Sequence, residues 1–161
     1  MLIKAETLRD LSIGEVMRLH GPENLERGRR EWPLEPLPRQ LALAEQEAIE
    51  DLRAFFWLPG TAVYAWQEDG HYCASLRLEP HGDGLLLTCL AAAPELRGRG
   101  YGTLFLRQVL DRLSQPVYSH IDHRNAASIR VHEKCGFRRI ADTASLLDGS
   151  VTSRLGTYRF P

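Results

Sequence analysis

The sequence predicts a single domain over residues 1–161 with an α/β (α+β) fold, in which a mixed sheet is flanked by helices on both faces. Two patterns support this. In the middle of the chain, three apolar runs follow one another closely with turn residues between them, which is typical of antiparallel hairpins. Afterwards, apolar runs alternate with amphipathic segments, which is typical of strands connected through helices.

The N-terminal part of the chain predicts a strand, a helix and an irregular segment. Residues 1–6 form the strand, and Thr7 caps a helix over residues 8–20. A Gly-Pro dipeptide follows and is expected to end that helix. Residues 24–38 are rich in proline and arginine, and we expect them to be irregular. A connection of this length is typical of a binding loop or of a disordered segment.

The rest of the chain predicts further strands and helices. A helix over residues 40–57 comes first. The strands are expected over residues 62–67, 71–78, 85–92, 116–121, 137–143 and 151–160, and the later helices over residues 101–113 and 125–135. Asp69 and Gly70, between the first two of these strands, are a strong hairpin signal. With the N-terminal strand, the sheet has about seven strands.

Composition and charge exclude several classes of protein. The net charge of -1 gives no electrostatic reason to bind nucleic acid or an anionic membrane. No apolar run approaches the roughly 20 residues that span a bilayer. The first residues lack the pattern of a signal peptide, so we expect a cytoplasmic protein. The three cysteines lack a C-x-x-C spacing, so we expect neither a metal site nor disulfides.

The segment Arg97-Gly98-Arg99-Gly100-Tyr101-Gly102 predicts an anion site. It joins a predicted strand to a predicted helix, and its alternating glycines let the backbone approach a ligand closely. The first amides of a helix have no partners, and the helix dipole makes that end positive. Such a loop suits a phosphate group, to which the two arginines add positive charge.

A second segment, residues 125–137, supports this interpretation. It predicts a helix that ends at Gly136 and is followed by Phe137 as an apolar anchor. At helical spacing, Asn125, Ser128 and His132 share one stripe of that helix. The sequence therefore places polar side chains together on a helix that follows the anion loop.

These two segments resemble the GNAT superfamily of acetyl-CoA-dependent N-acetyltransferases. Arg97, Gly100 and Gly102 match its Arg/Gln-x-x-Gly-x-Gly/Ala signature, and residues 125–137 are similar to its later Asn-x-x-Ala/Ser and Gly-Phe motif. The order of strands and helices also fits over nearly the whole chain. The resemblance implies a mostly antiparallel sheet with one splayed parallel pair, and acetyl-CoA (coenzyme A) as co-substrate without a metal.

The resemblance also implies which residues bind the coenzyme. The pyrophosphate is expected on the backbone amides of the loop, and the pantetheine arm along the strand before it and the helix after it. The expected coenzyme-binding residues are Leu90, Ala91, Ala92, Leu96, Arg97, Gly98, Arg99, Gly100, Tyr101, Gly102, Asn125 and Ser128.

Transfer of an acetyl group to an amine needs an unprotonated amine, a donor for the oxyanion and a proton for the leaving thiolate. Many relatives supply that proton from a tyrosine, and His132 stands at the matching position. Histidine is a stronger acid than tyrosine but only about a quarter cationic at pH 7. Glu79 and His120 are the main candidates for the general base, and His81 and His123 are further ones.

The sequence leaves the acceptor open. The first interpretation is a primary amine of a small molecule or of an amino-acid-like acceptor, attacking directly in a ternary complex. The alternatives are a protein acetyltransferase, acting on an N-terminus or a lysine, and a catalytically silent acyl-CoA-binding sensor. A closed pocket would favour a small acceptor and an open groove a protein. A homodimer through residues 141–160 is possible by resemblance.

Overall fold

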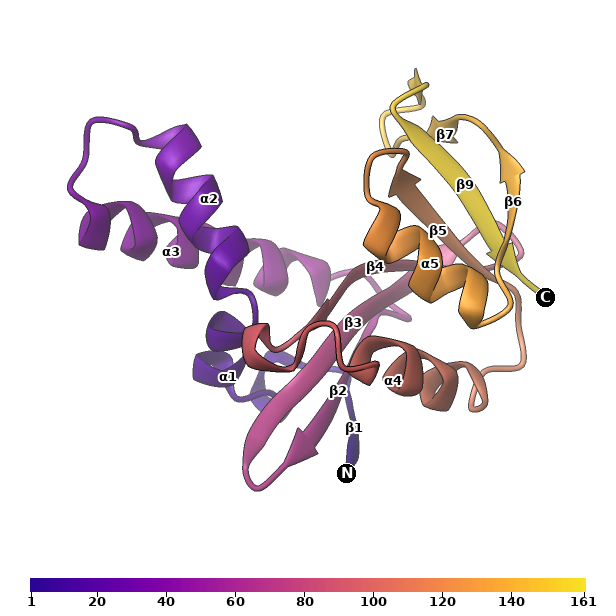
Figure 1. Cartoon of the computed structure of the whole chain (residues 1–161), viewed down its shortest axis with the longest axis horizontal. Helices are drawn as coiled ribbons and strands as arrows, with labels where there is room; N and C mark the ends of the chain where they lie inside the picture. Colours follow the sequence, from indigo (N-terminus) through magenta and orange to yellow (C-terminus); the bar gives the residue numbers. More distant parts are fainter.

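The computed structural model describes residues 1–161 and contains a mixed seven-stranded sheet in the order β1-β2-β3-β4-β5-β9-β6 (Figure 1). Its strands are β1 (Leu2–Ala5), β2 (Ala62–Glu68), β3 (His71–His81), β4 (Gly84–Ala92), β5 (Val117–Asp122), β6 (Arg138–Ala141) and β9 (Leu155–Phe160). The pair of β4 and β5 is parallel, and all other pairs are antiparallel. The predicted fold class is therefore confirmed.

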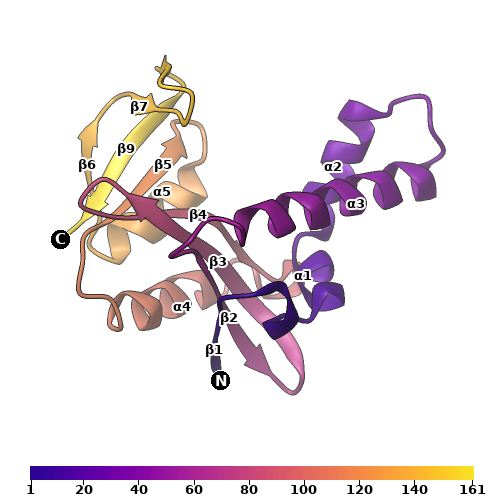
Figure 2. The same cartoon turned by 180° about the vertical axis from the view of Figure 1, so that it is seen from behind.

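Helices cover both faces of this sheet (Figures 1 and 2). One face carries α1 (Ile13–Leu19), α2 (Gly21–Glu31) and α3 (Leu37–Phe55), and the other carries α4 (Tyr101–Leu110) and α5 (Ala126–Lys134). Two short 3-10 helices, η1 (Leu8–Asp10) and η2 (Pro94–Leu96), lie in the connections. None of the helices combines the length and the apolar character that crossing a bilayer requires.

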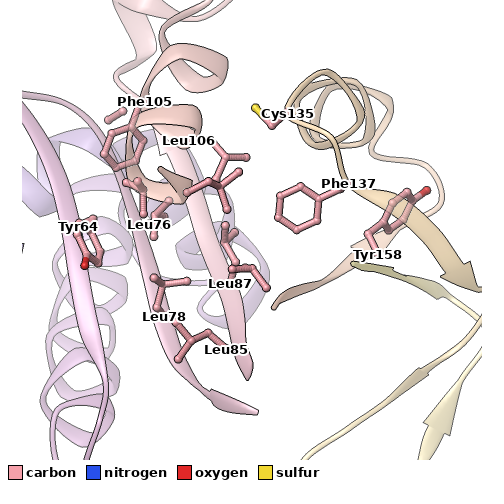
Figure 3. Packing of buried hydrophobic residues seen from close by; sticks show 14 of the residues in the cluster. Tyr64, Leu76, Leu78, Leu85, Leu87, Phe105, Leu106, Cys135, Phe137 and Tyr158 are labelled. Carbon is pink, nitrogen blue, oxygen red and sulfur yellow. The ribbon is translucent and has the colours of Figure 1, made fainter. Parts of the chain in front are cut away.

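Two hydrophobic clusters lie on opposite faces of the sheet, and alternate residues of the central strands contribute to each. Leu76 and Leu78 of β3 pack with Leu106 of α4, and Figure 3 shows Phe137 and Tyr158 from the C-terminal part beside them. The other cluster lies under α1 and α3. Because successive strand residues point to opposite faces, Arg77 and Glu79 are directed away from α4. This alternation decides which polar residues can reach which side of the sheet.

The turn between β2 and β3 has the predicted form. Asp69 and Gly70 have φ values of 47° and 84°, and a two-residue hairpin loop with two positive φ angles matches the twist of the strands. The prediction of an antiparallel hairpin is confirmed.

The helix predicted over residues 8–20 is interrupted. Residues 8–10 form η1, and α1 begins only at Ile13. The carboxylate of Asp10 accepts hydrogen bonds from the backbone N–H and the hydroxyl of Thr7, each at 2.9 Å. The N–H of Ser12 donates to the Tyr72 hydroxyl at 3.0 Å, which replaces a helical bond to residue 8. A side chain from the sheet thus divides the segment.

The prediction of an irregular segment over residues 24–38 was wrong. Helix α1 does end at Leu19, before the Gly-Pro pair, as predicted, but Gly21 and Pro22 also begin α2, because proline needs no hydrogen-bond partner in a first turn. Helix α2 packs against α3, and Gly28 allows this, since a Cβ there would lie 2.5 Å from the Gln40 carbonyl oxygen. The irregular connection is limited to residues 32–36.

The last predicted strand, residues 151–160, is two strands. Val151–Thr152 (β8) pairs with Ala144–Ser145 (β7) in a separate hairpin, whereas β9 pairs with β5 and β6. The chain bends at residues 153–154 between them. A continuous strand would have carried β8 past the end of β5, where it has no partner.

Candidate active site

Strands β4 and β5 pair only along their first residues. Leu85 lies opposite Val117 and Leu87 opposite Ser119, and no pair follows. Beyond this point β4 pairs only with β3, and β5 only with β9. The two neighbouring parallel strands therefore splay apart, as the resemblance implied, and leave an opening in the middle of the sheet.

A β-bulge marks the same point of β4. Arg77 of β3 lies opposite Thr88, whereas Ser75 lies opposite Ala91, so β4 carries an extra residue. Cys89 within the bulge has a φ of 53°, which is rare for a residue with a side chain. A bulge leaves its extra residue outside the hydrogen-bond ladder. Backbone groups of β4 are therefore available to a ligand in the opening.

A cleft of about 510 Å³ lies beside this opening, between the end of β4, the loop before α4 and one side of α5. All of the predicted coenzyme-binding residues line it except Arg99. Gly100 is the N-cap of α4, with a φ of 85° and a ψ of -2°, and no side chain caps the helix. The first amides of α4 therefore face the cleft without partners, which is the arrangement that binds phosphate.

The positive charges at the cleft differ from those expected. The guanidinium of Arg97 already has protein partners, since its Nη2 lies 2.7 Å from Glu23 Oε1 and its Nε donates to the Ala92 carbonyl at 3.1 Å. Two further cations, Arg130 and Lys134 of α5, line the cleft and were missed in the sequence. Their i, i+4 spacing puts them on one helix face, and this signal could have found them.

Asn125 and Ser128 also lie at the cleft, at the start of α5. The Asn125 Oδ1 accepts a hydrogen bond from the Ser128 backbone N–H at 3.1 Å, so Asn125 caps the helix. Both side chains line the cleft as well. The cap fixes where the Ser128 hydroxyl stands relative to the cleft.

His132 is buried behind the residues that line the cleft. Its side chain is 1% exposed, and its ring meets Phe137 edge to face with centroids 4.9 Å apart. Nδ1 lies 2.8 Å from the Ser128 carbonyl oxygen, so Nδ1 carries the proton. Nε2 is buried and has no hydrogen-bond partner. Burial lowers the pKa of His132, while the hydrogen bond to Ser128 opposes this, so the neutral ring with a bare Nε2 is favoured.

The candidate bases lie on the opposite face of the sheet. The His81 ring meets the rings of His120 and Tyr118 at 5.5 and 5.4 Å between centroids. Burial, and then the neighbouring His81, lower the pKa of His120. Glu79 is on the same strand and face as His81, and none of these groups lines the cleft. His123 binds the Asp142 carbonyl at 3.0 Å, away from them.

A second cavity, of about 520 Å³, lies on that opposite face. Helices α1, α2 and α3 form its walls, and Arg77 and Cys89 of the sheet form its floor. Glu23 lines both this cavity and the cleft, so the two adjoin at Glu23 and at the bulge. The segment predicted as an irregular binding loop thus contributes to a cavity, but as a helix.

His20 lines the second cavity and was missed in the sequence, where it appeared only as the end of a helix. Its Nε2 lies 3.4 Å from the Ser75 hydroxyl. Burial lowers the pKa of His20; Glu23 opposes this shift, and Arg77 and Arg97 add to it. His20 is therefore a neutral imidazole beside the bulge. No local pattern shows this, because the cavity forms only when α1 packs on β3.

Comparison with known proteins identifies the family. The model of the acetyltransferase (GNAT) family matches residues 27–137. The chain belongs to this family and is an N-acetyltransferase. Members of the family use acetyl-CoA as co-substrate. No curated protein sequence matches the chain.

Solved structures share the fold at low sequence identity. A protein of Acinetobacter baylyi has a TM-score of 0.65 and 14% identity, over 99% of this chain and 92% of that one. An acetyltransferase of Thermus thermophilus has a TM-score of 0.62 and 17% identity, over 100% of this chain and 96% of that one. The ribosomal-protein-S18-alanine N-acetyltransferase of Escherichia coli has a TM-score of 0.56 and 16% identity, over 99% of this chain and 91% of that one. At these identities the likeness concerns the fold alone.

Proposed function

We propose that residues 1–161 act as one domain that transfers an acetyl group from acetyl-CoA to a primary amine of a small molecule. The observation that carries the proposal is the pair of cavities on opposite faces of the sheet, which adjoin at Glu23 and at the bulge of β4. One cavity suits a phosphate-bearing carrier and the other an acceptor. An amine and a thioester held on either side of the opening can react directly in a ternary complex.

The cleft supports coenzyme binding through backbone and cationic groups. The free amides at the start of α4 suit the pyrophosphate, and Arg130 and Lys134 add positive charge. The backbone of residues 90–92 suits the amide groups of the pantetheine arm. A bound acetyl-CoA supplies the activated acetyl group, and the chain supplies its position.

The second cavity supports a small acceptor. Its volume of about 520 Å³ lies within the range that is typical of small-molecule sites, about 300–1,000 Å³. A protein acceptor and a silent coenzyme sensor remain the alternative outcomes of the assay below.

The chemistry needs two proton transfers. The nitrogen forms a bond to the acetyl carbon, the bond from that carbon to sulfur breaks, the amine loses a proton and the sulfur gains one. His20 is placed in the acceptor cavity as a neutral imidazole, which suits removal of the amine proton. The resemblance makes His132 our candidate for the proton of the sulfur, although it lines neither cavity and its bare Nε2 must first take up a proton. Glu79 and His120 line neither large cavity and are the weaker candidates for the base.

Release of coenzyme A thiol from acetyl-CoA, measured with a panel of amines, tests this function together with His132. We expect turnover by the wild-type protein and a loss of about 100-fold or more in kcat for His132→Phe, the usual range for acid–base groups. Affinity for coenzyme A should change little, because His132 does not line the cleft.

Two outcomes would contradict these assignments. Unchanged turnover in both His132→Phe and His132→Ala removes His132 from the mechanism. Tight coenzyme binding without turnover of any amine by the wild-type protein supports a sensor instead of an enzyme.

The pH dependence of kcat/KM tests His20. A base acts in its neutral form, and a lowered pKa keeps His20 neutral to a lower pH than the ordinary value of about 6.5. We therefore expect kcat/KM to lose the His20 contribution only as the pH falls below about 6.5. His20→Gln should remove this acidic limb and lower kcat/KM by about 100-fold. An unchanged limb in the variant assigns it to another group.

Location and assembly stay predictions from the sequence. We propose a cytoplasmic protein, and a possible homodimer through residues 141–160. Exposed apolar side chains of that region, Leu146, Leu147 and Val151, are consistent with a contact there. Analytical ultracentrifugation of the purified protein measures the oligomeric state.

A further inference from the structure

Arg77 is an arginine without a carboxylate partner on the floor of the second cavity. It lies on β3 opposite Thr88, next to the bulge at Cys89. It is half-buried, and its side chain takes part in none of the ion pairs or hydrogen bonds of the structure. Arg77 lines the cavity, so its donors are free to bind an anionic group of a ligand there.

The other arginines around the cavity are already paired. Arg27 binds Glu47 at 2.9 Å and Asp51 at 3.0 Å, and Arg30 binds Glu31 at 2.9 Å. Among the carboxylates, Glu23 is held by Arg97, and only Glu26, which is exposed, has no arginine partner. Among the arginines that line the cavity, Arg77 is therefore the one whose guanidinium has no carboxylate partner.

The guanidinium of Arg77 lies over the aromatic ring of Phe55. Its Cζ lies 5.5 Å from the centroid of the Phe55 ring, a distance at which a cation and an aromatic face attract each other. Nearby, the Asn24 side chain is 6% exposed and has only a 3.7 Å contact from its amide nitrogen to the sulfur of Met17. A positioned cation and a poorly satisfied amide together suit an acidic group of a ligand.

We propose that Arg77 binds the carboxylate of the acceptor, so that the enzyme acetylates free amino acids or closely related amino carboxylates. This inference rests on the proposed function, because it assigns the second cavity to the acceptor. Binding the carboxylate at Arg77 holds the neighbouring amine beside the bulge, on the same side of the sheet as His20. Arg77 sets specificity and takes no part in proton transfer.

The test compares each free amino acid with its own carboxamide, which keeps the amine and side chain but loses the negative charge. For wild-type protein and Arg77→Gln, kcat/KM is measured by thiol release with both members of each pair. We expect Arg77→Gln to lose about 10- to 100-fold with amino acids, the usual effect of removing a hydrogen bond to a charged group. With carboxamides it should lose less than about threefold.

Two controls separate charge from folding. Arg53→Gln removes an exposed arginine of α3 that lines neither cavity and should leave all values unchanged. Arg77→Lys keeps the charge but not the fork of donors, and we expect it to recover part of the activity with amino acids.

The outcomes are distinguishable from those of the proposed function. Wild-type protein that acetylates polyamines or carboxamides better than amino acids overturns the role of Arg77 and leaves the acetyltransferase function standing. An equal loss for both members of a pair also overturns it. No turnover with any amine overturns the proposed function, and a thermal shift with amino acids that Arg77→Gln abolishes would still support carboxylate binding.

Discussion

Replacing Gly102 with leucine is expected to abolish coenzyme A binding while the protein stays folded. Gly102 lines the cleft, and a Cβ there would have no protein atom within 4 Å. Its φ is not in the left-handed region, so a side chain causes no backbone strain. Because Gly102 lines the cleft, we expect the leucine to extend into the space that the coenzyme would occupy.

The two effects of this change have opposite signs, which makes the prediction specific. Leucine favours a helix by up to about 1 kcal/mol over glycine, so the melting temperature should stay the same or rise. Isothermal titration calorimetry should show an affinity for coenzyme A weaker by about 100-fold, or about 2.8 kcal/mol. The same protein should lose turnover at ordinary acetyl-CoA concentrations.

Gly14→Leu is the matched control. Gly14 is an exposed residue of α1, its Cβ would also meet nothing within 4 Å, and it lines neither large cavity. The affinity of the Gly14→Leu variant for coenzyme A should equal that of the wild-type protein. Full affinity in Gly102→Leu would mean that the coenzyme binds elsewhere. Gly100→Val is a less clean test, because a φ of 85° strains any branched residue.

Replacing Gly84 with alanine is expected to have the largest effect on stability. Gly84 begins β4 beside β5, and a Cβ there would lie 2.0 Å from the Pro116 carbonyl oxygen. That oxygen accepts a hydrogen bond from Leu85 N at 2.9 Å, so it cannot move away without breaking the start of the parallel pair. We expect a loss of about 3 kcal/mol in the free energy of unfolding, at the upper end of overpacking effects.

Urea denaturation of Gly84→Ala and of Gly14→Ala measures this effect. Gly14→Ala should be neutral or stabilising by up to about 1 kcal/mol, because it adds a helix-forming residue in open space. A midpoint of Gly84→Ala equal to that of the wild-type protein would show that β4 and β5 can separate at this point without cost.

The parts of the fold that follow local rules could be predicted from the sequence. The Asp69-Gly70 hairpin and the loop up to Gly102 depend on neighbouring residues alone, and both have the predicted form. Helix α2 could not be found in this way, because a proline such as Pro22 occurs both in the first turn of a helix and just after the end of one. Helix α2 also packs on α3, where Gly28 meets the backbone of Gln40, and this contact between distant residues is not visible in a local pattern.

The candidate site divides along the same line. The cleft could be predicted, since the loop and α5 each carry a compact motif and almost all of the residues expected to bind coenzyme line it. The second cavity could not, because His20 and Arg77 come from separate elements and line one cavity only through the packing of α1 and α3 on the sheet. The burial of His132 and the identity of its protonated nitrogen also depend on Phe137 and on the Ser128 carbonyl, which sequence spacing does not show.

The short parallel pairing of β4 and β5 has a consequence for how the ligand-free chain behaves. Only three residue pairs connect β4 with β5, and therefore connect the strands β1 to β4 with the strands β5, β9 and β6. By contrast, β5 and β9 share six residue pairs. A ligand that bonds to the unpaired edges of both strands completes that ladder. By mass action, such a ligand stabilises the folded chain by RT ln(1 + [L]/Kd). The exchange of backbone amide hydrogens along β5 with solvent would then slow as the coenzyme concentration rises. In that case the ligand would supply hydrogen bonds that a neighbouring strand supplies elsewhere in the sheet.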